Sequence, residues 1–179
     1  MIINDLPTTV DISIQINIRQ ATIADVKRLE WFGQFAHYRN LFRRAFREQQ
    51  LGHRLMLIAD CNQFPVGCLF IAFNTNRRPP DWAEQCAYLY SLRVFGFLQG
   101  HGIGTRLILE AEQEIVKRGY SCATIAVAKS NHRARRLYER LGYVVYSDDP
   151  GQWHYPDHLG RIQYVNEPCW LLQKAVGLG

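Results

Sequence analysis

The chain has 179 residues, of which 47% are hydrophobic and 12% aromatic, so its composition excludes a disordered tail and favours a globular fold. No apolar run approaches the ~20 residues that span a bilayer, and the N-terminus lacks the basic and apolar regions of a secretory signal. We therefore expect a soluble, cytoplasmic protein without a membrane partner. The formal net charge of +5 favours a polyanionic ligand, without choosing among nucleic acid, a membrane surface and a cofactor.

The first half of the chain predicts a strand, a helical region and two more strands. These elements are Ile14–Arg19, then Ala24 to about Gln50 with a break near Gly33, then Arg54–Ala59 and Val66–Phe73, joined by a turn at Asp60–Pro65 and followed by a loop at Asn74–Gln85. Thr22 and Asp25 form a variant of the capping box that begins a helix.

The second half alternates strands with amphipathic helices that end at glycines. It predicts strands at Cys86–Val94, Cys122–Ala128, Tyr143–Tyr146 and Cys169–Val176, helices at Thr105–Arg118 and Asn131–Leu141, and an irregular polar segment at Ser147–Pro168. Neither a repeat nor a linker interrupts the chain, so we expect a single domain, residues 1–179. Its class is α/β, with a mixed central sheet and helices on both faces.

The five cysteines are scattered, odd in number and free of C-x-x-C pairs, which argues against a metal site or a full disulfide framework. Cys68, Cys86 and Cys122 lie inside apolar, strand-like runs, where a cysteine usually acts as a small buried hydrophobe. This interpretation fits a reducing compartment.

A glycine-rich turn, Gln99–Thr105, lies between a predicted strand and a predicted helix. Its glycines leave the backbone N–H groups open to an anion, and the helix N-terminus adds partial positive charge. The turn lacks the lysine of a Walker A loop and the third glycine of a dinucleotide fingerprint. A phosphate site and a plain strand-to-helix turn both remain open on these residues alone.

The next helix carries a second group of functional candidates. Asn131 lies at its start, where the side chain can cap the helix or bond a ligand amide, and Tyr138 lies two turns along on the same face. A phenol there can donate a proton to a leaving thiolate. The alternative is that Tyr138 is only a core aromatic.

These two signatures resemble the GNAT superfamily of acyl-CoA-dependent N-acetyltransferases. The family's motif Q/R-x-x-G-x-G/A is matched by Gln99, Gly102 and Gly104, and its later helix pattern by Asn131, Ala134, Tyr138, Gly142 and Tyr143. The close resemblance covers roughly Tyr88–Tyr146 and extends weakly to the N-terminal strand and helix.

The resemblance implies a central mixed sheet of about six to seven strands, in which Cys86–Val94 and Cys122–Ala128 run parallel and splay around acetyl-CoA. Tyr138 would be the general acid that protonates the CoA sulfur. The residues that would bind the co-substrate are Leu92, Arg93 and Val94 along the pantetheine, Gln99, Gly100, His101, Gly102, Ile103, Gly104 and Thr105 at the pyrophosphate, and Asn131 near the pantetheine. No metal is implied.

The chain departs from the family at the general base. Many members carry a carboxylate on the strand before the glycine turn, and Tyr88–Arg93 has none. Asp81, Glu84, His154 and His158 are the remaining candidates, although each also suits an exposed surface.

The sequence signal for the acceptor-binding side is less specific. Arg39, Arg43 and Arg47 recur every four residues within the aromatic segment Trp31–Gln50, and form either a solvated face or a surface that prefers acidic acceptors and repels polyamines. Trp153, His154, Tyr155 and Trp170 either wall the acceptor or pack in the core.

Three functions follow in decreasing order of support. The first is transfer of an acetyl group from acetyl-CoA to a primary amine of a small molecule or peptide. The second is a non-catalytic acyl-CoA-binding regulatory module. The third, nucleic-acid binding through the arginine stripe, has no base-reading motif, so we expect no nucleic-acid partner. A homodimer is compatible with all that the sequence contains.

Overall fold

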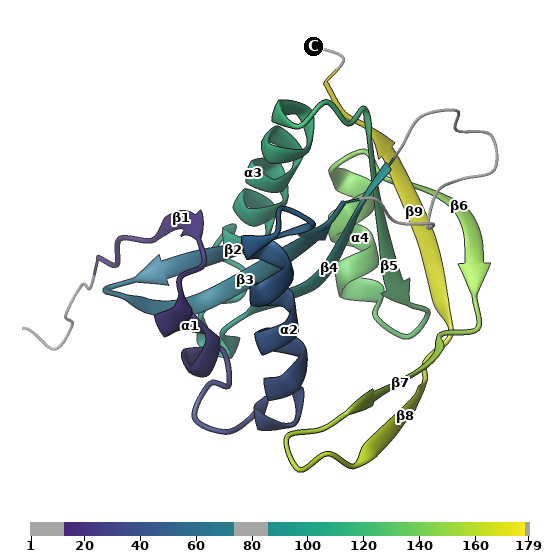
Figure 1. The fold of residues 1–179 in the computed structure, drawn as a ribbon. Helices are drawn as coiled ribbons and strands as arrows, with labels where there is room; N and C mark the ends of the chain where they lie inside the picture. The colour runs from purple at the N-terminus through teal and green to yellow at the C-terminus, as the bar shows by residue number, and fades with distance from the viewer. Residues whose placement is uncertain (1–12, 74–85, 178–179) are drawn as a thin grey trace, which may run out of the picture.

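The computed structural model describes residues 13–73 and 86–177, which form a layered α/β structure around one large sheet (Figure 1). The strands are β1 (Asn17–Gln20), β2 (Arg54–Cys61), β3 (Phe64–Ala72), β4 (Cys86–Val94), β5 (Cys122–Ala128), β6 (Val144–Asp149), β7 (Gln152–Pro156), β8 (Ile162–Asn166) and β9 (Cys169–Ala175). The α-helices are α1 (Ile23–Arg28), α2 (Arg39–Gln50), α3 (Ile103–Lys117) and α4 (His132–Arg140), with short 3-10 helices at Ala36–Tyr38 and Gly96–Leu98.

The main sheet has seven strands in the order β1-β2-β3-β4-β5-β9-β6, and β7 and β8 pair separately as a hairpin. Within this sheet β4 and β5 are parallel, whereas the other neighbours are antiparallel. This arrangement confirms the predicted mixed α/β class with a splayed parallel pair.

Helices cover both faces of the sheet because its central strands are apolar on both sides. On β2, Leu55 and Leu57 belong to the core cluster that contains Leu107 of α3, whereas Met56 belongs to the cluster that contains Phe42 of α2. The helices α1 and α2 therefore pack on one face, and α3 and α4 on the other.

The N-terminal helical region divides as its sequence predicts. Asp25 accepts hydrogen bonds from the Thr22 backbone N–H at 2.8 Å and from its hydroxyl at 2.9 Å, which confirms the capping box. Positive φ angles at Trp31 (43°), Phe32 (58°) and Gly33 (95°) break the helix where the glycine predicted. The segment between α1 and α2 then continues as turns and a 3-10 helix rather than as regular α-helix.

Several predicted boundaries shift. The turn between β2 and β3 is limited to Asn62 and Gln63, both at positive φ, because the two strands extend their pairing as far as Cys61 and Phe64. Helix α3 begins two residues earlier than predicted, at Ile103. The predicted loop at 74–85 lies outside the described residues.

The expectation of an irregular segment at Ser147–Pro168 was wrong. It contains the second half of β6 and the whole β7–β8 hairpin, in which Gln152 pairs with Asn166 and Pro156 with Ile162. The sequence signal is weak because the hairpin stands apart from the main sheet and is mostly exposed. On β7 the exception is Tyr155, whose ring is buried.

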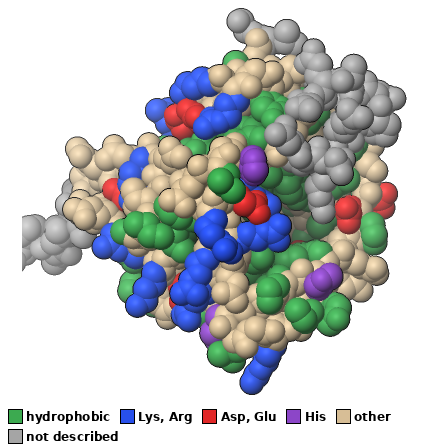
Figure 2. Space-filling view, in the orientation of Figure 1, with side chains coloured by type: hydrophobic (Ala, Val, Ile, Leu, Met, Phe, Trp, Pro, Cys, Tyr) green, Lys and Arg blue, Asp and Glu red, His purple; other side chains and the backbone are tan. Residues whose placement is uncertain are grey.

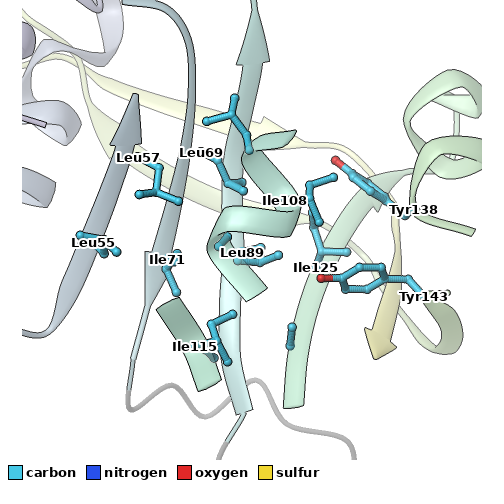
Figure 3. Close-up of a cluster of buried hydrophobic side chains, with 14 of the residues drawn as sticks. Leu55, Leu57, Leu69, Ile71, Leu89, Ile108, Ile115, Ile125, Tyr138 and Tyr143 are labelled. Carbon is cyan, nitrogen blue, oxygen red and sulfur yellow. The ribbon is translucent and has the colours of Figure 1, made fainter. Parts of the chain in front are cut away.

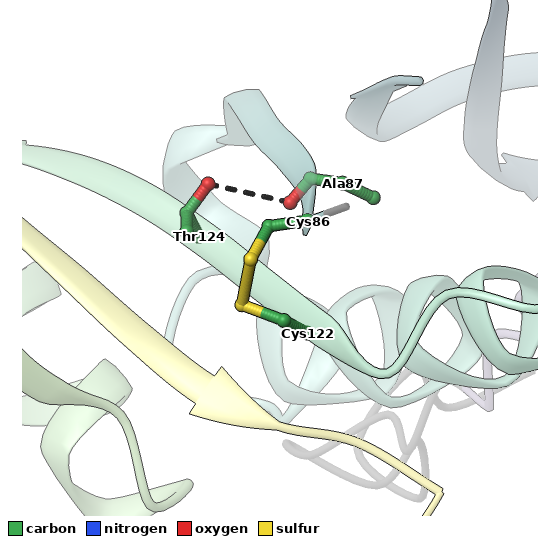
Figure 4. Close-up of a disulfide and its surroundings, with 4 residues drawn as sticks. All are labelled: Cys86, Ala87, Cys122 and Thr124. Carbon is green, nitrogen blue, oxygen red and sulfur yellow. Dashed lines mark hydrogen bonds between the residues drawn. A yellow bond between two sulfur atoms is a disulfide. The ribbon is translucent and has the colours of Figure 1, made fainter. Parts of the chain in front are cut away.

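The interpretation of Cys86 and Cys122 as separate buried hydrophobes was also wrong. Both are buried, but they form a disulfide between the first residues of β4 and β5 (Figure 4). The parallel register brings them face to face, with Cα atoms 4.5 Å apart, although 36 positions separate them in sequence. Cys68 behaves as predicted, as a buried thiol.

Candidate active site

The candidate site lies where β4 and β5 stop pairing. Their parallel register runs from Cys86 opposite Cys122 to Leu89 opposite Ile125 and then ends. Beyond this point β3 still pairs with β4 as far as Val94, and β9 still pairs with β5 as far as Ala128. Ser91 has φ of 57°, in the left-handed region, at the same level as a register shift against β3. The two strands consequently open into a gap held from outside by their other neighbours.

The glycine turn lies at one mouth of this gap. Gly100 and Gly102 have φ of 89° and 81°, which suits residues without a Cβ, and Gly102 is the N-cap of α3. The first amides of α3 lack partners within the helix and point out of its N-terminus. A Cβ on Gly104 would lie 3.6 Å from Leu137 and 3.9 Å from Val94, which are ordinary contact distances, so this part of α3 packs beside α4 and β4.

A cavity of about 350 Å³ opens over this turn, and we call it the turn cavity. Its lining contains most of the predicted co-substrate residues: Leu92, Val94, Gln99, Gly100, Gly102, Ile103, Gly104, Thr105 and Asn131. It also contains Arg133 and Arg140 of α4, which the sequence reasoning missed. Their signal was the basic run of α4, although only the fold shows which of its arginines face the turn.

Arg133 is joined directly to the turn. Its guanidinium donates to Gln99 Oε1 at 2.8 Å, while Gln99 Nε2 donates to the Val94 carbonyl at 3.0 Å. The side chain also lies 3.9 Å from the position of a Cβ on Gly100. This chain of contacts holds one positive charge beside the open amides of the turn.

A second cavity, of about 520 Å³, lies in the gap itself, and we call it the strand cavity. It is lined by Tyr90–Arg93 of β4, Ile125–Ala128 of β5, Ser130, Asn131, Ala134, Tyr138 and Glu167. Leu92, Asn131 and Ala134 line both cavities, so the two adjoin.

Tyr138 projects from α4 toward the sheet with its hydroxyl leading (Figure 3). The residue is 5% exposed and packs against Tyr143 at 6.2 Å between ring centroids. Burial, with a smaller contribution from Tyr88, raises the pKa of the Tyr138 hydroxyl well above its usual range. This group therefore keeps its proton at neutral pH.

Other predicted residues occupy different positions. The Oδ1 atom of Asn131 accepts the Ala134 N–H at 3.1 Å, which confirms its helix-capping position. The His101 ring contacts the Leu98 carbonyl at 3.2 Å and lines a neighbouring cavity with Arg106 rather than the turn cavity. Arg93 lines the strand cavity, and its guanidinium packs over the rings of Phe35 and Tyr38 at 4.8 and 4.9 Å.

The sequence profile of the acetyltransferase (GNAT) family matches residues 22–143, about two thirds of the chain. The chain belongs to the GNAT family. As a member of this family it is an acyltransferase that uses acetyl-CoA as donor, and the resemblance drawn from the two sequence signatures is confirmed.

Solved structures agree with this GNAT fold across nearly the whole chain. Arabidopsis thaliana NAA60, solved with acetyl-CoA, superposes with a TM-score of 0.70 at 17% identity over 90% of this chain and 98% of its own. The ribosomal-protein-S18-alanine N-acetyltransferase of Escherichia coli gives 0.64 at 20% identity over 92% and 96%. The PaiA N-acetyltransferase of Thermoplasma acidophilum, solved with coenzyme A, gives 0.64 at 18% identity over 90% and 99%.

On the opposite face of this GNAT sheet, the β7–β8 hairpin meets the start of α2. The rings of Tyr155 and Tyr38 lie 5.1 Å apart, and His37 packs on Tyr38 at 4.1 Å. Asn40 also donates to the Asp157 carbonyl at 2.5 Å. Of the predicted aromatic residues, Trp153 joins this cluster through Tyr155, whereas Trp170 packs against Lys129 and Arg135.

The arginine stripe of α2 divides into a paired and an exposed part. Arg39 forms an ion pair with Glu30 at 2.7 Å, which lowers the pKa of the Glu30 carboxyl. Arg43 and Arg47 remain exposed beside a groove between α1 and α2, and Figure 2 shows basic side chains gathered over this region. The stripe lines neither the turn cavity nor the strand cavity.

Neither His154 nor His158, the two base candidates within the described residues, lines the strand cavity. Asp81 and Glu84 lie outside the described residues, and His154 is exposed against Tyr164. His158 is exposed at the far end of the hairpin.

Over residues 13–73 and 86–177, no group of three His, Cys, Asp or Glu side chains could hold a metal ion. Within the same residues, no helix is both long and apolar enough to cross a membrane.

Proposed function

We propose that this protein transfers an acetyl group from acetyl-CoA to a primary amine of a small molecule or peptide, by direct attack of the amine, with Tyr138 as general acid. The observation that carries the proposal is the junction of the two cavities. An anion-binding turn and a buried, protonated phenol share Leu92, Asn131 and Ala134 as neighbours. Acyl transfer from a thioester with a nucleotide end needs both groups within the length of one substrate.

The turn cavity suits the pyrophosphate of the donor. The open amides from Gly100 to Thr105 supply hydrogen-bond donors, the N-terminus of α3 supplies partial positive charge, and Arg133 and Arg140 supply full charges. Gly100 and Gly102 have no Cβ, so phosphate oxygens can approach the backbone there closely.

The open edge of β4 suits the pantetheine arm. Leu92–Val94 have lost β5 as a neighbour, so their backbone groups on that side are available to the two amides of the arm. Arg93 contributes through its backbone in this proposal, because its side chain packs among the rings of Phe35 and Tyr38. The arm would lead from the turn cavity into the strand cavity, toward Tyr138.

Tyr138 then acts at the sulfur. As the amine nitrogen bonds to the carbonyl carbon, the C–S bond breaks and the thiolate leaves. The Tyr138 hydroxyl donates its proton to that thiolate, whose negative charge the apolar surroundings disfavour. The raised pKa of this phenol keeps the proton in place until the thiolate forms.

A thiol-release assay with acetyl-CoA over amino acids, unblocked peptides, aminoglycosides and polyamines tests this function. We expect acceptor-dependent release of CoA, with an acetylated amine as product by mass spectrometry. Tight CoA binding with no release on any amine would support the non-catalytic acyl-CoA-binding module instead.

We also propose a cytoplasmic location, and the disulfide makes this part of the proposal testable. Disulfides are rare in reducing compartments. Thiol counting on protein purified with and without a thiol-blocking reagent during lysis reports whether Cys86 and Cys122 are paired in the cell.

A further inference from the structure

The strand cavity contains one acid that the sequence reasoning did not consider. Among the described residues that line it, the side chains with a titratable proton are Tyr90, Arg93, Tyr138 and Glu167. An amine acceptor is an ammonium ion at neutral pH and has to lose a proton before its nitrogen can attack. That proton passes to one of these four groups, to a group outside the cavity or to solvent water.

Three of the four cannot accept it. Burial raises the pKa of both the Tyr90 and Tyr138 hydroxyls, so each already holds its proton. The Arg93 guanidinium is positively charged and has no acceptor site. Glu167 is exposed and is a carboxylate, the side-chain type that accepts protons and attracts a cation.

The chain also fixes the position of Glu167 through its backbone. This residue joins the β7–β8 hairpin to β9, and its N–H donates to the Gly151 carbonyl at 3.1 Å. Its own carbonyl accepts the Cys169 thiol at 3.0 Å. Gly151 has φ of 66°, and a Cβ there would lie 1.7 Å from the backbone carbonyl oxygen of Glu167, so a glycine is required for this close approach.

The Glu167 carboxylate is available to a ligand. Most carboxylates near the sheet are in ion pairs, as Asp25 is with Arg19 at 2.7 Å and Glu112 with Lys174 at 2.7 Å. Within the part of the chain that the structure describes, Glu167 forms no such pair.

We propose that Glu167 binds the ammonium group of the acceptor in the strand cavity and acts as the general base of the transfer. This assignment depends on the proposed N-acetyltransferase function. One N–H proton of the ammonium passes to the carboxylate, directly or through one water, and the freed lone pair attacks the thioester carbon. The C–S bond breaks, and Tyr138 protonates the thiolate. The second proton lost by nitrogen restores the Tyr138 phenol, while the proton on Glu167 passes to solvent, so one proton is released per amide formed.

His37 is the competing base. Burial, together with Arg93 and His158, lowers the pKa of its imidazole, so it is neutral at pH 7 and able to take a proton. Its ring packs against Tyr38 and Tyr155 and is not part of the strand cavity. The two groups therefore differ in place, and a variant of each separates them.

The test compares Glu167→Gln with wild type and with Glu139→Gln, an exposed glutamate on α4 that lines neither cavity. The acceptor is the amine with the largest kcat/KM in the thiol-release screen. We expect kcat/KM of Glu167→Gln to fall about 10²-fold at pH 7 and to approach wild type above the pKa of the amine, where the acceptor needs no base. Hydroxylamine, which is uncharged at neutral pH, should react with this variant nearly as fast as with wild type. CoA affinity and melting temperature should stay unchanged, and Glu139→Gln should match wild type throughout.

Three results would overturn the assignment. Activity of Glu167→Gln within about twofold of wild type at pH 7 removes the base role. An equal loss at every pH and with hydroxylamine indicates a structural role for the junction. The pH-dependent loss appearing in His37→Gln instead transfers the role to that histidine. A wild-type protein that releases no CoA with any amine contradicts the proposed function itself, which no result on the variants alone can do.

Discussion

The two ends of the β4–β5 pair differ sharply although the same two strands form both. At the closed end, Cys86–Leu89 pair in register with Cys122–Ile125, the Thr124 hydroxyl donates to the Ala87 carbonyl at 3.3 Å, and a disulfide joins the first residues. At the open end, Tyr90–Val94 and Ala126–Ala128 no longer pair and are mostly half-buried around two adjoining cavities.

Residue type does not explain this difference. Neither Tyr90–Val94 nor Ala126–Ala128 contains a proline or glycine, so each segment could continue the ladder. The separation instead comes from the left-handed backbone of Ser91 and from β3 and β9, which hold the two halves apart from outside. A sheet can thus form a ligand site where two ordinary neighbouring strands stop pairing with each other. The predictions below test each end of the pair separately.

The largest expected effect is at the open end. Tyr138→Phe removes the proposed acid and should lower kcat by about 10²- to 10⁴-fold while the Kd of CoA changes little, because Tyr138 does not line the turn cavity. Tyr143→Phe is the matched control, since this buried tyrosine lines neither cavity. Stopped-assay turnover and CoA titration measure the two quantities. Unchanged turnover in Tyr138→Phe would remove this residue from the acid role.

The next effect is at the closed end. Replacing both Cys86 and Cys122 by alanine opens a crosslink between positions 36 apart and should lower the free energy of unfolding by about 2–4 kcal/mol. Urea denaturation measures it, and Cys68→Ala, which removes a buried thiol without a crosslink, is the control. We expect the folded variant to keep its CoA affinity, because β3 and β9 hold the open end. Loss of CoA binding by the folded variant would mean that the closed end controls the open one.

A smaller effect is expected at the mouth of the open end. Arg133→Gln removes a charge beside the glycine turn and its bond to Gln99, and should weaken CoA binding about tenfold, or about 1.4 kcal/mol. Calorimetric titration at two salt concentrations should also show a weaker salt dependence. Arg136→Gln, an exposed arginine of the same helix that lines neither cavity, should bind CoA as wild type does. Equal losses in both variants would indicate a general charge effect.

The smallest expected effect concerns the pH profile of kcat, which should show no decline near pH 10. A tyrosine with an ordinary pKa loses its proton near pH 10. Burial raises the pKa of Tyr138, so its acid form persists above that range and kcat should not fall between about pH 9 and 10.5. The profile of kcat at saturating amine and acetyl-CoA measures this. A decline centred near pH 10 in wild type and missing in Tyr138→Phe would contradict the buried, protonated state.

Much of the donor side could be predicted because its signals are local. The strands Cys86–Val94 and Cys122–Ala128 are apolar runs with the observed limits, and the glycine turn leads into α3, whose N-cap is Gly102. Asn131 caps α4 through an amide three residues along. Each of these features depends on neighbours within a few positions, which a single sequence contains.

The acceptor side could not be predicted to the same extent because its contacts join distant segments. The β7–β8 hairpin is short and mostly exposed, so its alternation is a weak signal, and its contact with α2 links positions 117 apart through Asn40 and Asp157. Glu167 was overlooked for the same reason. In sequence it is one more charged loop residue, and only the pairing of β9 beside β5 brings it to the strand cavity.

The sequence by itself determined the α/β class, the order of the elements around the site, the glycine turn and the helix that presents Tyr138, because periodicity, caps and glycine positions act over one or two turns of chain. The tertiary structure alone decided three things: where β4 and β5 part, which arginines of α4 face the turn, and that Cys86 meets Cys122. Each of these depends on the register between strands and on packing across the sheet. Such relations form only when segments far apart in the chain are brought together.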